Sequence, residues 1–183
     1  MHKSTEMTMK QILGAAICLL AISSALAASQ TTKITTDYLM TLYAPLEPPQ
    51  KIDKSLTIYN VGPGGWVKGP KVNGTLLAPA ADWIRVMPDG NLRQDVRLTI
   101  KTHDGALIYV TYNGIISRSR EVDKRDASGE VLTSADEYFL MAPTMETSSK
   151  TYIWLNHVQC VGKMVDVKTG ANSFVKYEIF IVR

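Results

Sequence analysis

Cysteine and histidine are scarce in this sequence of 183 residues, which contains two cysteines and three histidines. Cys18 lies in an N-terminal apolar segment, so removal of that segment would leave Cys160 without an intramolecular disulfide partner. We expect Cys160 to be a small buried hydrophobic residue. His103 and His157 do not pair at the spacing that metal sites use, and we expect neither a metal nor a cofactor.

An excess of one charge is also lacking, because 20 basic and 17 acidic residues give a formal net charge of only +3. Nucleic-acid binding normally needs a concentrated basic face. The only dense charged run, at residues 118–130, alternates in sign, and we interpret it as a solvated loop. We therefore expect no nucleic-acid partner. The Gly-x-Ser-x-Gly elbow of many serine hydrolases is absent as well, which argues against that chemistry.

The longest apolar run, residues 11–26, is interrupted and falls short of the roughly 20 strongly apolar residues of a membrane-spanning helix. A lysine precedes it and a small-residue triplet, Ala-Leu-Ala, closes it, which is the layout of a secretory signal peptide. We expect residues 1–27 to be a signal peptide cleaved after Ala27, residues 28–35 a linker, and residues 36–183 a single domain. The protein would then be periplasmic or secreted, without a stable membrane anchor.

The rest of the chain consists of short strand-like runs separated by glycine and proline, and no segment there sustains helical periodicity over ten residues. The expected runs lie at 36–45, 56–61, 66–68, 76–78, 83–86, 92–103, 106–112, 137–142, 152–161 and 173–183. We expect Pro143 to end the run before it. Short strands at near-regular spacing are typical of an all-β barrel or sandwich. We favour a single antiparallel β-barrel, because closure removes exposed sheet edges.

Two glycine-containing signals predict how neighbouring strands are joined. Asn73-Gly74 is the two-residue signal of a tight hairpin turn. Asp104-Gly105 joins the run at 92–103 to the run at 106–112, which we expect to end at Asn113-Gly114. These two runs are therefore predicted to form an antiparallel hairpin.

The run at 92–103 has two different faces with a period of two residues. Leu92, Val96, Leu98 and Ile100 lie on one face with Gln94 as the polar exception, and Arg93, Asp95, Arg97, Thr99, Lys101 and His103 lie on the other. Asp95 and Arg97 are neighbours on the polar face, so they can form an ion pair or grip a carboxylate or enolate together. The polar face either lines the barrel lumen or is the wet outer face of the sheet.

Several separated motifs follow one another along the chain: Ala81-Asp82-Trp83, Pro88-Asp89-Gly90, Asp95-x-Arg97, Thr102-x-Asp104-Gly105-Ala106-x-Ile108-Tyr109, Tyr138-Phe139, Pro143 and Tyr152-x-Trp154-Leu155-Asn156. Their order and spacing over about residues 36–183 resemble the signature of the DUF3237 family, also called UPF0311. The resemblance implies an antiparallel β-barrel of this size, in a family whose biochemical role is undefined. The signal-peptide pattern and the charged insertion at 118–135 depart from the family pattern.

A barrel of about eight strands can hold one small ligand in its mouth. Candidate ligand-binding residues are Trp83, Asp95, Arg97, Tyr109, Asn113, Trp154 and Asn156. Tyr109 and Asn113 share one side of their strand, and Trp154 and Asn156 would do so in a strand at 152–161. The alternative for each aromatic residue is a core position with a local hydrogen bond. We expect an apolar or aromatic ligand, anionic if it is held by Arg97.

A second hypothesis is a cofactor-independent isomerase, cyclase or lactone hydrolase that uses the same lumen. Asp95 or His157 would then act as the base, while Arg97 and Tyr109 would stabilise an oxyanion. His157 lies on the strand face opposite Trp154, which makes it a weaker candidate for the base. A third hypothesis is a structural or interaction module with a filled barrel. The candidate partners are thus a small molecule and, for a homo-oligomer, a second copy of the chain.

Overall fold

The computed structural model describes residues 32–183, so the predicted signal peptide and its cleavage point lie outside the described residues. Residues Ile34–Arg183 form one compact unit. Its strands are β1 (Thr36–Pro45), β2 (Gln50–Lys51), β3 (Leu56–Asn60), β4 (Trp66–Lys68), β5 (Asn73–Val86), β6 (Leu92–Thr102), β7 (Leu107–Ser117), β8 (Leu132–Thr133), β9 (Tyr138–Glu146), β10 (Cys160–Lys168) and β11 (Phe174–Val182). Its helices are α1 (Arg120–Ala127) and the 3-10 helix η1 (Ile153–His157), and neither is long and apolar enough to cross a membrane.

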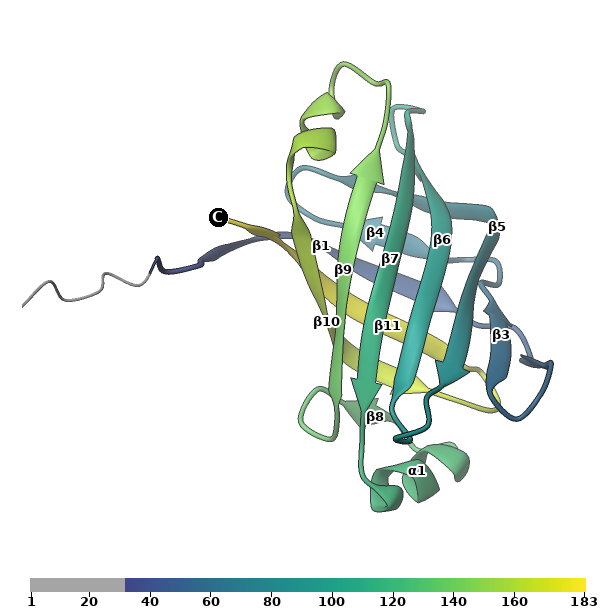
Figure 1. The fold of residues 1–183 in the computed structure, drawn as a ribbon. Helices are drawn as coiled ribbons and strands as arrows, with labels where there is room; N and C mark the ends of the chain where they lie inside the picture. Colours follow the sequence, from purple (N-terminus) through teal and green to yellow (C-terminus); the bar gives the residue numbers. More distant parts are fainter. Residues whose placement is uncertain (1–31) are drawn as a thin grey trace, which may run out of the picture. The chain divides into compact units, whose positions relative to one another are not determined.

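Eight strands close into an antiparallel barrel in the order β5-β4-β1-β11-β10-β9-β7-β6, and β6 pairs back onto β5 (Figure 1). The long strand β5 changes register between Leu77 and Ala81, so its first part pairs with β4 and its second part with β3. Figure 1 shows α1 and β8 at one end of the barrel and the β9–β10 connection at the other. The predicted all-β, antiparallel barrel is therefore confirmed.

The hydrophobic core fills the barrel interior, because alternate residues of each strand point inward. On β6 the buried positions include Val96, Leu98 and Ile100, each at most 2% exposed, and on β11 they include Ile179. Tyr177 is fully buried and meets neighbouring rings edge to face. Burial of each such aliphatic side chain contributes roughly 1.5–3 kcal/mol, so the inward rows fix both the closure and the strand register.

The predicted β6–β7 hairpin is confirmed, but two glycines that we expected in turns lie inside strands. Asn73 and Gly74 begin β5, and the turn before it lies at residues 69–72. A side chain at Gly74 would overlap the main chain of β6. Gly114 lies within β7, opposite Gln94. Both glycines thus serve the close approach of a neighbouring strand rather than a turn.

The predicted strand at 152–161 and the predicted break at Pro143 are wrong. Residues Ile153–His157 form η1, whose loop is closed by the Asn156 amide: it donates to Thr147 O over 3.0 Å and accepts from Thr147 N over 2.9 Å. Strand β9 runs through Pro143 to Glu146, because its pairing with β10 is confined to Leu140 and Met141. A proline is tolerated where a strand has lost one neighbour.

The charged run at 118–130, predicted to be a loop, contains the helix α1. Ser119 caps it, because the Ser119 hydroxyl accepts a hydrogen bond from Val122 N over 3.3 Å. Glu121 and Asp123 lie in the first turn, where negative charge favours a helix. The alternating charges of this run therefore belong to a capped helix at the barrel end.

Candidate functional site

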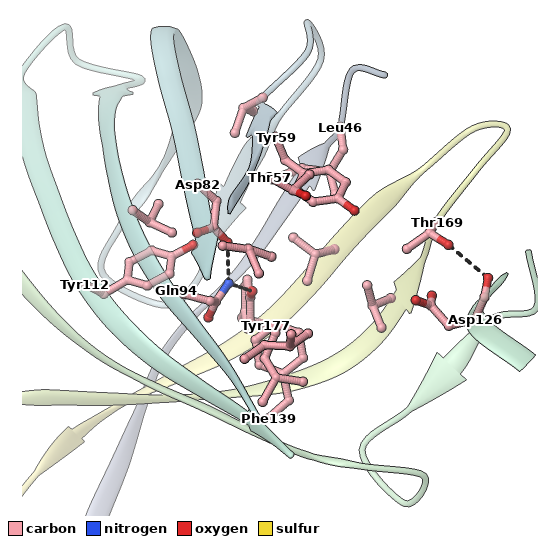
Figure 2. Close-up of a pocket in the computed structure, with 18 of the residues that line it drawn as sticks. Leu46, Thr57, Tyr59, Asp82, Gln94, Tyr112, Asp126, Phe139, Thr169 and Tyr177 are labelled. Carbon is pink, nitrogen blue, oxygen red and sulfur yellow. Dashed lines mark hydrogen bonds between the residues drawn. The ribbon is translucent and has the colours of Figure 1, made fainter. Parts of the chain in front are cut away.

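A cavity of about 220 Å³ lies inside the barrel at the end that carries α1 and β3 (Figure 2). Most of its wall is apolar and comes from β1, β5, β6, β7, β9, β10 and β11. The apolar lining residues are Ala44, Leu46, Val61, Ile84, Val86, Leu92, Val96, Leu98, Ile116, Phe139, Val167 and Val175. Predominantly apolar walls of this kind are typical of pockets that bind small apolar ligands.

Three buried polar side chains meet at the inner part of this cavity. The Gln94 amide Nε2 donates to Asp82 Oδ2 over 2.6 Å and to the Tyr177 hydroxyl over 3.0 Å. Figure 2 shows these three groups drawn together by the two bonds, with Tyr112 beside them. Within residues 32–183, no group donates a hydrogen bond to Gln94 Oε1, which is buried against Gly114 of β7. The inner polar cluster therefore contains one unsatisfied acceptor.

Burial controls the protonation of the inner polar cluster. It raises the pKa of Asp82 to about 7, against the opposing hydrogen bonds from Gln94 and from the Asp95 main chain. Burial also raises the pKa of Tyr112 and of Tyr177, so both phenols are neutral near pH 7. Asp82 alone can change its charge in this range, which gives the cluster one site for proton exchange.

A second polar cluster lies where α1 meets the barrel. Arg118 Nη2 bonds to Asp126 Oδ2 at 2.9 Å, and Arg118 Nη1 lies 3.6 Å from Glu137 Oε2. The Arg118 Nε atom donates to Asp123 Oδ1 over 2.7 Å. Burial raises the pKa of Glu137 to about 7, although the nearby Arg118 opposes this change. These groups form the outer polar cluster, which α1 and its connection to β7 place against the cavity.

The structure brings four of the sequence-predicted binding residues together, but outside the barrel. Trp83, Asp95, Arg97 and Asn113 line a shallow outer depression with Arg85 and Arg93. The Asp95–Arg97 ion pair has an N···O distance of 2.8 Å, and both side chains are about half exposed, at 48% and 52%. Arg97 also lies over the Trp83 ring, 5.8 Å from its centre. Of the two alternatives for the polar face of β6, the structure shows the outer face of the sheet, because the apolar face of the same strand occupies the interior.

The other predicted site residues lie apart from both the cavity and this depression. Tyr109 is 40% exposed near the start of β7. Trp154 lies in η1 with the Lys71 ammonium 5.6 Å from its ring centre. Asn156 is occupied by its bonds to Thr147, and His157 is exposed at the end of η1. None of these four residues lines the cavity.

Sequence reasoning missed the residues that do line the cavity with polar atoms, although one signal was visible. Gln94 is a polar residue between Leu92 and Val96 in the apolar row of its strand. A buried polar residue in such a row needs partners, and those partners prove to be Asp82 and Tyr177. In residues 32–183 no group of three or more His, Cys, Asp or Glu side chains has the arrangement of a metal site.

Comparison with known sequences identifies relatives of this chain. A family model described as "Protein of unknown function (DUF3237)" matches residues 34–182. A UPF0311 protein of Clostridium acetobutylicum is 38% identical over 95 residues, which are 51% of this chain and 60% of the relative. A UPF0311 protein of Rhodopseudomonas palustris is 31% identical over 99 residues, 54% of this chain and 65% of the relative. The chain thus spans less than two thirds of the length of these relatives.

Solved structures share the fold over most of the chain. A conserved protein of unknown function from Rhodopseudomonas palustris has a TM-score of 0.75 at 25% identity, and covers 84% of this chain and 99% of its own. A β-barrel-like protein of Acinetobacter baumannii has a TM-score of 0.67 at 27% identity, covering 85% and 99%. An enzyme from Penicillium herquei has a TM-score of 0.62 at 23% identity, covering 85% and 98%, a likeness of fold. With its barrel and its match over residues 34–182, the chain belongs to the DUF3237 family of proteins of unknown function.

Proposed function

We propose that this protein binds a small, mostly apolar molecule in the cavity at the α1 end of the barrel. The observation that supports this proposal is the combination of apolar walls with the buried, hydrogen-bonded cluster of Asp82, Gln94 and Tyr177. Such a pattern is typical of ligand sites, where a few placed polar groups orient an apolar ligand.

The size of the cavity limits the ligand. An engineered apolar cavity of about 150 Å³ holds benzene. The 220 Å³ found here therefore suits a molecule of one or two fused rings. The sequence-based expectation of an anionic ligand depended on Arg97, which lies outside the barrel. We expect a ligand without negative charge.

Fluorescence titration with 2-naphthylmethanol tests this proposal. We expect saturable binding to the full-length protein. The substitution Ala44→Leu fills part of the cavity wall and should weaken binding at least tenfold. Ala142→Leu is the matched control, because Ala142 is exposed on the outside of β9, and it should bind like the wild type. Absence of saturable binding, or equal affinity in the Ala44→Leu variant, would contradict the proposal.

Asp82 favours a second candidate function, cofactor-independent proton transfer on the bound molecule. Its carboxyl group lies in an apolar cavity with a pKa of about 7, the condition in which a carboxylate can both accept and return a proton near neutral pH. Asp82 would take a proton from a carbon next to a carbonyl and return it at the same or a neighbouring atom. The substrate is neither oxidised nor reduced, as in an isomerisation. Asp82 thus replaces Asp95 and His157 as the candidate base.

Proton exchange measures this activity directly. In D2O, we expect the wild type to accelerate deuterium uptake at the α-carbons of 2-tetralone, an apolar two-ring ketone. The Asp82→Asn substitution should reduce this acceleration at least 100-fold, and the variant should still bind 2-naphthylmethanol. An unaccelerated wild-type rate, or full activity in Asp82→Asn, would exclude the role of Asp82.

We also propose that the protein is exported and cleaved after Ala27. The basic, apolar and small-residue regions of residues 1–27 support this proposal. N-terminal sequencing of the exported protein should begin at Ala28. An intact N-terminus on exported material would contradict the proposed cleavage.

A further inference from the structure

The charged groups that line the cavity are mostly acidic. Three carboxyl groups belong to Asp82, Asp126 and Glu137, and one guanidinium group belongs to Arg118. Among the described residues 32–183, no lysine and no histidine lines the cavity. With all four groups ionised, the lining would carry two more negative than positive charges. A carboxylate or phosphate brought by a ligand would be repelled by this negative charge in a poorly solvated space.

The donors of Arg118 are not free for an anionic ligand, because acidic side chains already occupy its guanidinium group. Its three nitrogens face Asp123 at 2.7 Å, Asp126 at 2.9 Å and Glu137 at 3.6 Å. The Arg118 side chain is only 18% exposed, so these contacts are largely shielded from solvent. An anionic ligand would therefore have to displace an existing carboxylate from Arg118.

Acceptor atoms, in contrast, are unused at this end of the cavity. Both carboxyl oxygens of Glu137 and the Oδ1 atom of Asp126 are buried and accept no hydrogen bond from any group within residues 32–183. The Glu137 side chain has no exposed surface, and it lines the cavity. Figure 2 shows the Asp126 carboxyl group directed toward the aliphatic side chains of the wall. Buried acceptors without donors destabilise the protein, so a ligand that supplies donors here is stabilised by new hydrogen bonds.

We propose that the ligand is an apolar amine, whose protonated nitrogen donates to Glu137 and Asp126 while its apolar body lies toward Gln94 and Tyr177. This inference rests on the proposed binding function and names its ligand class. An ammonium group supplies three donors and a positive charge, which together match the unused acceptors and the acidic excess. The outer polar cluster would thus select the charge of the ligand, and the inner polar cluster would orient its far end.

The preference for an amine should depend on pH in a defined direction. The charged groups facing Glu137 are Arg118, Asp126 and the neighbouring Asp136. With a pKa of about 7, Glu137 is mostly ionised at pH 8 and mostly neutral at pH 5, whereas an aliphatic amine remains protonated at both. Attraction to the ammonium group is therefore greater at pH 8. Asp82 titrates in the same range, and a Glu137 variant separates the two contributions.

Three probes with one naphthalene body test the inference: 2-naphthylmethylamine, 2-naphthylmethanol and 2-naphthoate. At pH 8 we expect the amine to bind the full-length protein at least tenfold more tightly than the alcohol, and the carboxylate at least tenfold more weakly. Glu137→Gln should reduce the affinity for the amine about tenfold and leave that for the alcohol within twofold. Asp126→Asn is the second variant, with the same expected direction, should Glu137→Gln fail to fold. Lowering the pH to 5 should remove most of the amine preference in the wild type.

The outcomes separate this inference from the proposed function. Binding of the alcohol that is sensitive to Ala44→Leu, without a preference for the amine, overturns the inference and leaves the proposed function standing. An amine preference that survives in both the Glu137→Gln and Asp126→Asn variants also overturns it. If none of the three probes binds, both fail. Arg97→Ala, on the outer face, is the charge control and should leave all three affinities unchanged.

Discussion

Gly114 of β7 lies directly opposite Gln94 of β6, and any side chain at Gly114 would overlap the Gln94 amide oxygen. The absent side chain therefore makes room for the only inward-pointing amide of the cavity wall. This pairing explains a glycine in the middle of a strand, where glycine is otherwise unfavourable. It also makes the orientation of Gln94 dependent on a residue that contributes no atoms to the cavity.

The first prediction concerns this pair. Gly114→Ala should lower the free energy of unfolding by about 1–3 kcal/mol, because overpacking displaces the Gln94 amide. Gln94→Ala removes the overlapping atoms, so the double variant Gln94→Ala/Gly114→Ala should lose less than the sum of the single variants. Urea denaturation of the three variants measures this coupling. Strict additivity would show that Gly114 does not act through Gln94.

The second prediction concerns the buried carboxyl group of Asp82. Its folded-state pKa of about 7 exceeds the ordinary value of 3.8, so the folded protein holds this proton more tightly than the unfolded chain. The contribution of Asp82 to the free energy of unfolding is then greatest below about pH 4 and decreases as the pH rises to about 7. Over this range the contribution changes by about 4 kcal/mol.

Urea denaturation between pH 4 and pH 8 checks this prediction. Asp82→Asn cannot ionise and should show a flatter dependence of stability on pH than the wild type, with the remaining slope due in part to Glu137. Asp37→Asn is the control, because Asp37 is exposed, and it should keep the wild-type slope. Parallel curves for the wild type and Asp82→Asn would contradict the raised pKa.

The third prediction concerns Arg118. Arg118→Met would leave Asp126 and Glu137 buried without their cation, and should lower the free energy of unfolding at pH 8 by about 3–5 kcal/mol. At pH 5 the loss should be smaller, because Glu137 is then mostly protonated. Thermal or urea denaturation at the two pH values provides the measurement. A loss that is equal at both would show that Arg118 acts mainly by packing.

The fourth prediction concerns the outer ion pair of Asp95 and Arg97. Both side chains are about half exposed, and exposed pairs contribute little, so Arg97→Ala should change stability by no more than about 1 kcal/mol. It should also leave the affinity for 2-naphthylmethanol unchanged, because Arg97 does not line the cavity. Isothermal titration calorimetry checks the affinity. A tenfold weaker affinity of Arg97→Ala for 2-naphthylmethanol would indicate that the ligand binds in the outer depression instead of the cavity.

Much of the barrel could be predicted from local patterns. β1 and β4 have the predicted bounds, and the β6–β7 hairpin follows from alternation and a glycine turn. Two of the errors share one cause, since contacts outside the segment decide its conformation. Gly114 was expected in a turn because its partner Gln94 was unseen, and the segment of η1 resembles a strand until Asn156 bonds to Thr147.

The sequence by itself determined the all-β class, the strand periodicity and the family, because these depend on residues near one another in the chain. Only the tertiary structure decided which face of β6 is inside, and therefore that Gln94, not Arg97, belongs to the cavity. The physical reason is that the sheet closes into a barrel. Residues as distant as Asp82, Gln94 and Tyr177 meet only when strands β5, β6 and β11 curve around one interior.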